Sequence, residues 1–178
     1  MVYMEEEFPN IRYFVDGGNY LINNYNVLTI GGAYSVDKWY RLQRAASMGS
    51  SFSGWFKDEQ LTEREMSLIS ENVKGKYFDF IFTHTCPFEW EPVDLFLNSV
   101  DQSSVDKSME RWLNQLKDTF DWGVWCFGHY HANRNERPCV EQYYTNIEDM
   151  ENIINRWLKY NDTGELNWWE TLSPNFYF

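Results

Sequence analysis

The sequence has few of the residues that indicate a disulfide framework or a membrane span. Only three cysteines are present, and Cys86, Cys126 and Cys139 show no Cys-x-x-Cys spacing, so neither disulfides nor a thiolate zinc site is indicated. We expect three buried thiols. No run of about 18 apolar residues occurs, and the acidic residues 1–8 lack the features of a signal peptide. These absences predict a soluble, cytoplasmic protein without a membrane partner.

Basic residues are also scarce in this chain. Fifteen Lys and Arg residues stand against 27 Asp and Glu residues, which gives a formal net charge of −12. Such a field repels phosphate backbones and attracts cationic surfaces. We therefore expect no direct nucleic-acid binding, and we expect a basic protein partner instead. The aromatic share of 19% favours either a large aromatic core or an aromatic interaction surface.

The order of strand and helix patterns predicts one α/β domain, because 178 residues suit a single core. Strands are expected at residues 11–15, 20–22, 27–30, 78–82, 122–127 and 140–144. Helices are expected at residues 62–74, 105–120 and 150–158, and Thr62-Glu63-Arg64-Glu65 has the sequence of a capping box. Residues 33–57 have neither period and predict a long loop. We expect residues 147–178, a helix and an aromatic tail, to pack on residues 1–146.

The chain has only three histidines, and each follows a predicted strand: His84, His129 and His131. In open α/β sheets, ligands bind beyond the carboxyl ends of the strands, and imidazole binds divalent transition metals. Two imidazoles two residues apart in an extended chain point to the same side, and Gly128 leaves room for close approach of a ligand. The pattern predicts a metal site. A Cys86–His84 nucleophilic pair is set aside, because residues i and i+2 rarely reach the required geometry.

Three segments carry a resemblance to a known family: Leu28 to Asp37, Thr83 to Pro87, and Gly128 to His131. In order and spacing they resemble the second half of calcineurin-like metallophosphoesterases, over roughly residues 10 to 145. The resemblance implies half of that layered β-sheet with flanking helices. It also implies that His84 and His129 share one metal ion and that His131 binds a second one. Two such ions about 3.5 to 4 Å apart activate water and clamp the phosphoester.

The binding residues beside these histidines are less clearly indicated. The segment from Lys38 through Arg41 to Arg44 is basic and rich in aromatic residues, and it has two interpretations: phosphate contact or a solvated loop. A carboxylate ligand would come from Asp37, Asp16 or Glu89, and nothing in the sequence selects among them. We take Asp37, Lys38 and Arg41 as the candidate binding residues.

The front-half motifs of the family are absent: this sequence has no Asp-x-His, no Gly-Asp-x-x-Asp, no Gly-Asn-His-Glu and no histidine before His84. Neutral imidazoles offset none of the charge on two adjacent divalent cations. We therefore expect a single divalent transition metal (manganese, zinc or iron) on two or three histidines, or no metal at all. A missing half also leaves a sheet face to be covered by residues 147–178 or by a second copy of the chain.

Two hypotheses for function follow. The first is a catalytically incomplete, acidic binding protein derived from a metallophosphoesterase. An example is a phage inhibitor of the anti-CRISPR type, which occludes the basic groove of an RNA-guided nuclease. The second is a metal-dependent phosphoesterase whose site is completed by dimerisation or by a second chain. We take the first as the prediction and keep the second as its alternative.

Overall fold

A computed structural model describes residues 2–96 and 101–163, and its centre is a six-stranded sheet in the order β3-β4-β5-β6-β8-β7. The inner strands β4, β5, β6 and β8 run parallel, while β3 and β7 are antiparallel edge strands. With helices on both sides, this arrangement confirms the predicted α/β class. The strands span Gly18–Ile22 (β3), Tyr25–Ile30 (β4), Tyr77–Thr83 (β5), Asp121–Phe127 (β6), Arg134–Arg137 (β7) and Val140–Gln142 (β8).

The hairpin that opens the sheet forms where turn residues predict it. Asn23 and Asn24 connect β3 to β4 with φ angles of 50° and 68°, a conformation that asparagine tolerates and that two-residue hairpins require. The strand expected at residues 11–15 is wrong in extent. Only Tyr13–Phe14 (β2) is extended there, and it pairs with Val2–Tyr3 (β1) in a separate two-stranded sheet whose residues are all exposed.

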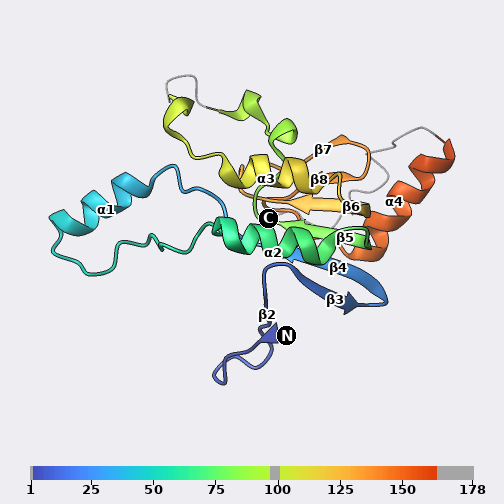
Figure 1. The fold of residues 1–178 in the computed structure, drawn as a ribbon, viewed down its shortest axis with the longest axis horizontal. Helices are drawn as coiled ribbons and strands as arrows, with labels where there is room; N and C mark the ends of the chain where they lie inside the picture. The colour runs from blue at the N-terminus through green and yellow to red at the C-terminus, as the bar shows by residue number, and fades with distance from the viewer. Residues whose placement is uncertain (1, 97–100, 164–178) are drawn as a thin grey trace, which may run out of the picture.

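One face of the sheet is covered by α2 (Glu63–Val73) and α3 (Ser108–Leu116), which Figure 1 shows lying side by side. The capping box at Thr62 is confirmed: its hydroxyl accepts from the Glu65 amide, and the Glu65 carboxylate accepts from the Thr62 amide at 2.8 Å. The helix expected at residues 105–120 is shorter than predicted. Residues Gln102–Ser104 form a 3₁₀ turn, and the main core of the fold lies beneath the two helices.

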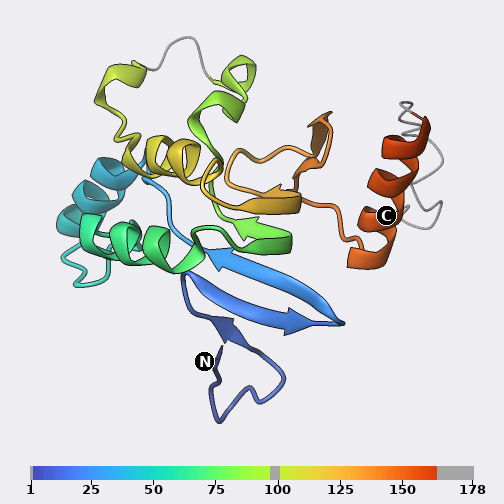
Figure 2. The same cartoon turned by 45° about the vertical axis from the view of Figure 1, so that its right-hand side comes forward.

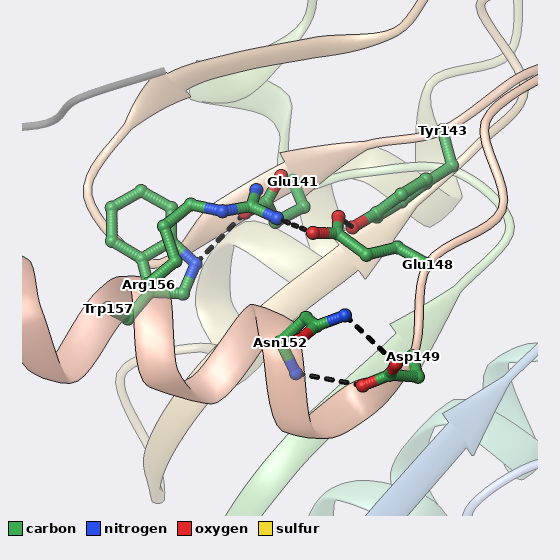
Figure 3. Close-up of polar contacts among 7 residues, drawn as sticks. All are labelled: Glu141, Tyr143, Glu148, Asp149, Asn152, Arg156 and Trp157. Carbon is green, nitrogen blue, oxygen red and sulfur yellow. Dashed lines mark hydrogen bonds and ion pairs between the residues drawn. The ribbon is translucent and has the colours of Figure 1, made fainter. Parts of the chain in front are cut away.

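The opposite face of the sheet carries α4 (Met150–Thr163), which stands across the sheet from α2 and α3 in Figure 2. Ile153 and Trp157 on this helix are buried against apolar residues of the sheet. Figure 3 shows the polar contacts that hold the helix: the Arg156 guanidinium lies 2.7 Å from the Glu141 carboxylate, and Trp157 Nε1 donates to the same oxygen at 3.0 Å. The predicted C-terminal helix is confirmed. The predicted aromatic tail, residues 164–178, lies outside the described residues.

The loop predicted over residues 33–57 is wrong in part, because Lys38–Ser47 form α1. This helix has no buried residue, and Trp39 and Tyr40 are each more than 60% exposed. It projects away from the sheet (Figure 1). The segment is amphipathic at helical period, so the loop prediction overlooked a signal that the sequence does carry, although the helix lays no face on the core. Within the described part of the chain, no helix is long and apolar enough to cross a membrane.

Candidate functional site

The candidate site lies at the edge of the sheet where β4, β5 and β6 end together. The hydrogen-bond ladder continues one step past these strands. The His84 amide donates to the Ile30 carbonyl at 3.1 Å, and the Gly128 amide donates to the His84 carbonyl at 3.0 Å. Parallel strands align their carboxyl ends, so the residues that follow β5 and β6 are held next to each other.

A cavity of about 880 Å³ lies over this edge, and all three histidines line it. The sequence placed His84, His129 and His131 at strand ends, and the fold brings them together. Other walls of the cavity come from the segment after β4, from residues before α2, and from the chain leading into α3. Besides the histidines, the charged or polar lining residues are Tyr34, Ser35, Asp37, Arg41, Asp58, Glu59, Gln102, Lys107, Glu110 and Tyr130, of which Arg41 lies on α1 and Glu110 on α3.

His84 and His129 lie next to each other, with their rings edge to face. Their ring centroids are 5.1 Å apart, with the rings inclined at 67°. Two imidazoles on one tetrahedral zinc ion, with Zn–N bonds of about 2.0–2.1 Å, place their ring centroids roughly 5 Å apart. Burial lowers the pKa of His84, and it lowers that of His129 to about 4. Both rings are therefore suited to the neutral state that metal ligation requires.

His131 lies differently from the other two. Its ring is stacked on Tyr144 with centroids 4.7 Å apart, and the residue is exposed. The expectation of an extended chain here is wrong, since His129 and His131 have φ angles of 67° and 54°. The Tyr130 amide donates to the Gly128 carbonyl at 2.8 Å, which closes a tight three-residue turn around His129. Positive φ at non-glycine residues is strained and recurs at ligand sites.

Glu59 is a carboxylate whose charge acts on His84, and the sequence analysis did not indicate it. Its charge raises the pKa of His84 against the effect of burial, and it accepts a hydrogen bond from the Ser35 hydroxyl. The turn after β4 places it there, because the Ala33 amide donates to the Glu59 carbonyl at 3.1 Å. Residues 48–61 have no helical or strand period, so no sequence signal indicated this contact.

Of the three carboxylates that the sequence offered as metal ligands, the structure places only one in the lining of the cavity. Asp37 lines the cavity, but its carboxylate pairs with Arg41 at 2.7 Å. Asp16 accepts from the Gly31 amide, and Glu89 lies 3.3 Å from the Lys117 ammonium. Neither of these two lines the cavity.

Of the three candidate binding residues, two line the cavity and one does not. Arg41 lines the cavity together with Asp37, and its Nη1 atom donates to the Gly54 carbonyl at 2.6 Å. Lys38 does not line it; its ammonium lies 4.3 Å from the centre of the Trp55 ring. Arg41 is therefore the member of the basic segment that can meet an anion in the cavity, since a guanidinium binds phosphate oxygens in two places.

A buried polar network supports the histidine turn from below. The Thr85 hydroxyl donates to Glu110 Oε1 at 2.7 Å and lies 3.0 Å from the Tyr130 hydroxyl. Cys86 is fully buried in this network, and burial raises the pKa of its thiol to about 12. Such a thiol carries almost no thiolate at neutral pH, so the structure gives no support to a Cys86–His84 nucleophilic pair.

The described residues do not form a complete metal centre. Across residues 2–96 and 101–163, no group of three or more His, Cys, Asp or Glu residues is arranged to hold a metal ion. The separation of the His84 and His129 rings is compatible with a shared ion, which would need further ligands to close its coordination. Comparison of the chain with protein-family models, with curated proteins and with solved structures finds no match.

Proposed function

We propose that this chain contributes the histidine half of a metal-dependent phosphoesterase site that a second copy or another chain completes. The observation that carries the proposal is the His84–His129 pair, with ring centroids 5.1 Å apart in the wall of an 880 Å³ cavity at the ends of β5 and β6. The order of the three segments that resemble metallophosphoesterases supports the same conclusion.

The residues of this chain have separate roles in the proposed site. His84 and His129 hold one divalent ion, and the tight turn at His129 sets where its side chain leaves the backbone. When bound, such an ion supplies Lewis-acid polarisation of a phosphoryl oxygen and activation of water. Arg41 orients the phosphate with a guanidinium that the Asp37 carboxylate holds at 2.7 Å. The carboxylates that balance the charge of the ion come from the completing chain.

Metal binding by the purified chain tests this proposal directly. We expect about one zinc ion per chain by calorimetry and elemental analysis, because imidazole ligands suit zinc, and at least tenfold weaker binding in His84→Ala and in His129→Ala. His131→Ala is the matched control, because this ring stacks on Tyr144, and we expect a smaller loss. Slow hydrolysis of bis-p-nitrophenyl phosphate should follow the same order. Absence of metal binding, or equal binding in all variants, would contradict the proposal.

The net charge of −12 supports a second candidate, the acidic inhibitor of a nuclease with a basic groove. This function needs no metal. The variant with His84, His129 and His131 all changed to Ala would then inhibit an RNA-guided nuclease as strongly as the wild-type chain. Failure of the wild-type chain to slow DNA cleavage at equimolar or higher concentration would exclude this candidate for the nuclease tested.

A further inference from the structure

The two edge strands of the main sheet differ in how they are protected from pairing with another strand. Strand β7 carries Arg134 and Arg137 and has a register shift between them, and charged side chains and bulges both discourage further pairing. Strand β3 has neither feature: its sequence GNYLI is uncharged, and its pairing with β4 runs without a register shift. The outer side of β3 is therefore an unprotected sheet edge.

The main-chain groups of Asn19 and Leu21 point outward from this edge. The two-residue turn after β3 makes the residues that flank it a hydrogen-bonded pair, and in an antiparallel ladder such pairs alternate with pairs that exchange no hydrogen bond. Leu21 and Asn26 form a pair of the second kind. The Asn26 amide accordingly donates away from β3, to the Asp79 carboxylate at 2.7 Å. The amide and carbonyl of Leu21 thus point away from β4, and those of Asn19, two residues earlier, do the same.

These outward groups are accessible. Leu21 is 71% exposed, and Asn19 is exposed as well. Within residues 2–96 and 101–163, no main-chain hydrogen bond uses the outward amide or carbonyl of either residue. A row of unpaired main-chain groups on an uncharged strand is the surface to which another β-strand adds.

The small sheet of β1 and β2 extends this surface. Figures 1 and 2 both show it next to the start of β3, on the side away from β4, and the rings of Phe14 and Tyr20 are 4.6 Å apart. Its strand residues Val2, Tyr3, Tyr13 and Phe14 are all exposed. A two-stranded sheet is at best marginally stable alone in water, so these apolar side chains gain from being covered. The open edge of β3 is therefore one part of a larger apolar surface.

The distribution of charge selects a second copy of the chain as the partner. Charged residues make up 24% of the chain and give a net charge of −12, so two copies repel each other across most of their surfaces. Residues 17–36 contain no charged residue, and β3 with its turn lies wholly within them. The acidic residues 5–7 belong to the loop between β1 and β2, which extends away from β3 in Figure 1. An uncharged strand does not attract a cationic partner, but it can meet an identical strand without repulsion, and interface cores are depleted of charge.

We propose that β3 is a homodimerisation edge, on which the β3 strand of a second copy pairs antiparallel and continues the sheet through both copies. The register that uses every outward group is centred on Tyr20. Asn19 of each copy then lies opposite Leu21 of the other, and each such pair exchanges both of its main-chain hydrogen bonds. The same surface meets itself across a two-fold axis, as in most soluble homodimers.

Such a dimer narrows the choice of partner that completes the histidine site. The cavity lies where β4, β5 and β6 end, and antiparallel pairing of β3 makes the β4 strands of the two copies run in opposite directions. The two cavities then lie at opposite edges of the joined sheet. A second copy bound through β3 brings no ligand to His84 and His129, so the completing carboxylates come from a different chain. Only the role of that chain rests on the proposed function; the dimer does not.

Sedimentation velocity of the full chain without added metal tests the dimer. We expect the mass to rise from 21.5 kDa towards twice this value as the protein concentration increases. Leu21→Glu places like charges near each other across the two-fold axis, and Asn19→Pro removes an outward donor without touching the pairing with β4. Each should weaken the dimer about tenfold or more. Leu68→Glu, which adds the same charge at an exposed leucine of α2, is the matched control and should dimerise like the wild-type chain.

Hydrogen exchange measured by NMR locates the interface in the wild-type chain and needs no variant. We expect the amides of Asn19 and Leu21 to exchange more slowly as the protein concentration rises, because the dimer pairs them. The amides of Tyr20 and Ile22 point toward β4 and should be protected at every concentration. Urea unfolding of the three variants shows that they fold.

A mass of 21.5 kDa at every concentration would overturn the proposal. A dimer that survives both Leu21→Glu and Asn19→Pro would do so too, because it would use another surface. Exchange at Asn19 and Leu21 that does not depend on concentration would have the same meaning. The zinc titration is separate: a chain that dimerises through β3 but binds no zinc would keep this inference and lose the phosphoesterase proposal, and a monomeric chain that binds zinc would do the reverse.

Discussion

Gly32 is the residue on which the shape of the cavity wall depends most directly. Its φ angle is +89°, and a Cβ atom there would lie 2.7 Å from the Glu59 carbonyl oxygen. That carbonyl accepts the Ala33 amide, the contact that holds Glu59 at the site. A side chain at residue 32 would therefore strain the backbone and push Glu59 away.

We expect Gly32→Ala to lower the free energy of unfolding by roughly 3 kcal/mol, the upper part of the usual range for single substitutions. Gly49→Ala is the matched control: it also has positive φ, at +63°, but nothing lies within 4 Å of the added methyl group. Its cost should be only the backbone term of roughly 1–2 kcal/mol. Urea unfolding measures both, and equal costs would show that the contact with Glu59 does not matter.

Cys86 and Cys139 differ in burial, so we expect their thiols to react at different rates. Cys86 is fully buried, and burial raises its pKa to about 12, whereas Cys139 is half-buried. The thiolate is the reactive form, so iodoacetamide at pH 8 should modify Cys139 well before Cys86 in the folded protein. Peptide mass spectrometry measures this order, with the urea-unfolded chain as the control. Equal labelling of the two residues in the folded state would contradict the structure.

At the scale of elements, α4 differs from the other helices in how it is attached. Its apolar residues Ile153 and Trp157 are buried on the sheet, and beside them Arg156 forms an ion pair with Glu141, with side chains 6% and 1% exposed. Glu148 accepts from the same guanidinium, as Figure 3 shows. Removal of one partner from a buried ion pair leaves an uncompensated charge, which costs more than the pair itself contributes.

We therefore expect Arg156→Met to destabilise the protein by about 3–5 kcal/mol, because Glu141 would be left buried without its cation. The double variant Arg156→Met, Glu141→Leu should recover much of this loss. Chemical denaturation of the two single variants and the double variant gives the coupling energy. If the double variant loses the sum of both single effects, the two side chains do not act as a pair.

Unlike α4, helix α1 is not packed on the sheet. It has no buried residue, so its apolar side chains contribute little to the core. Exposed substitutions away from special contacts usually change stability by less than about 0.5 kcal/mol. We expect Trp39→Ala, at a side chain that is 69% exposed, to stay within this limit. A loss above about 1 kcal/mol in urea unfolding would mean that α1 is packed against something in solution.

At the scale of the whole molecule, the acidic charge acts against the compact state. Twelve excess negative charges repel one another more in the folded chain than in the expanded one. Raising the salt concentration from about 10 mM to 100 mM shortens the Debye length from about 30 Å to 10 Å and weakens this repulsion. We expect the free energy of unfolding to rise over this range in sodium chloride. A fall would mean that attractive surface pairs outweigh the repulsion.

The sequence by itself determined the elements whose signals are local. The α/β class follows from the order of apolar strands and amphipathic helices. The hairpin follows from Asn23 and Asn24, and the start of α2 follows from the capping box at Thr62. The three histidines were placed after strands by the same patterns. These features depend on neighbours within a few residues, which is why a sequence can specify them.

Only the tertiary structure decided which side chains share the cavity and how they point. Glu59 and Glu110 have no motif that marks them; the turn at Gly32 and the packing of α3 bring them to the histidines. The backbone at His129 and His131 is not extended, because the chain turns tightly after β6. Helix α1 was predicted as a loop although its sequence is amphipathic, and it packs no buried face on the core. Long-range contacts decide the lining of the cavity and the turn after β6, and they leave no period in the sequence.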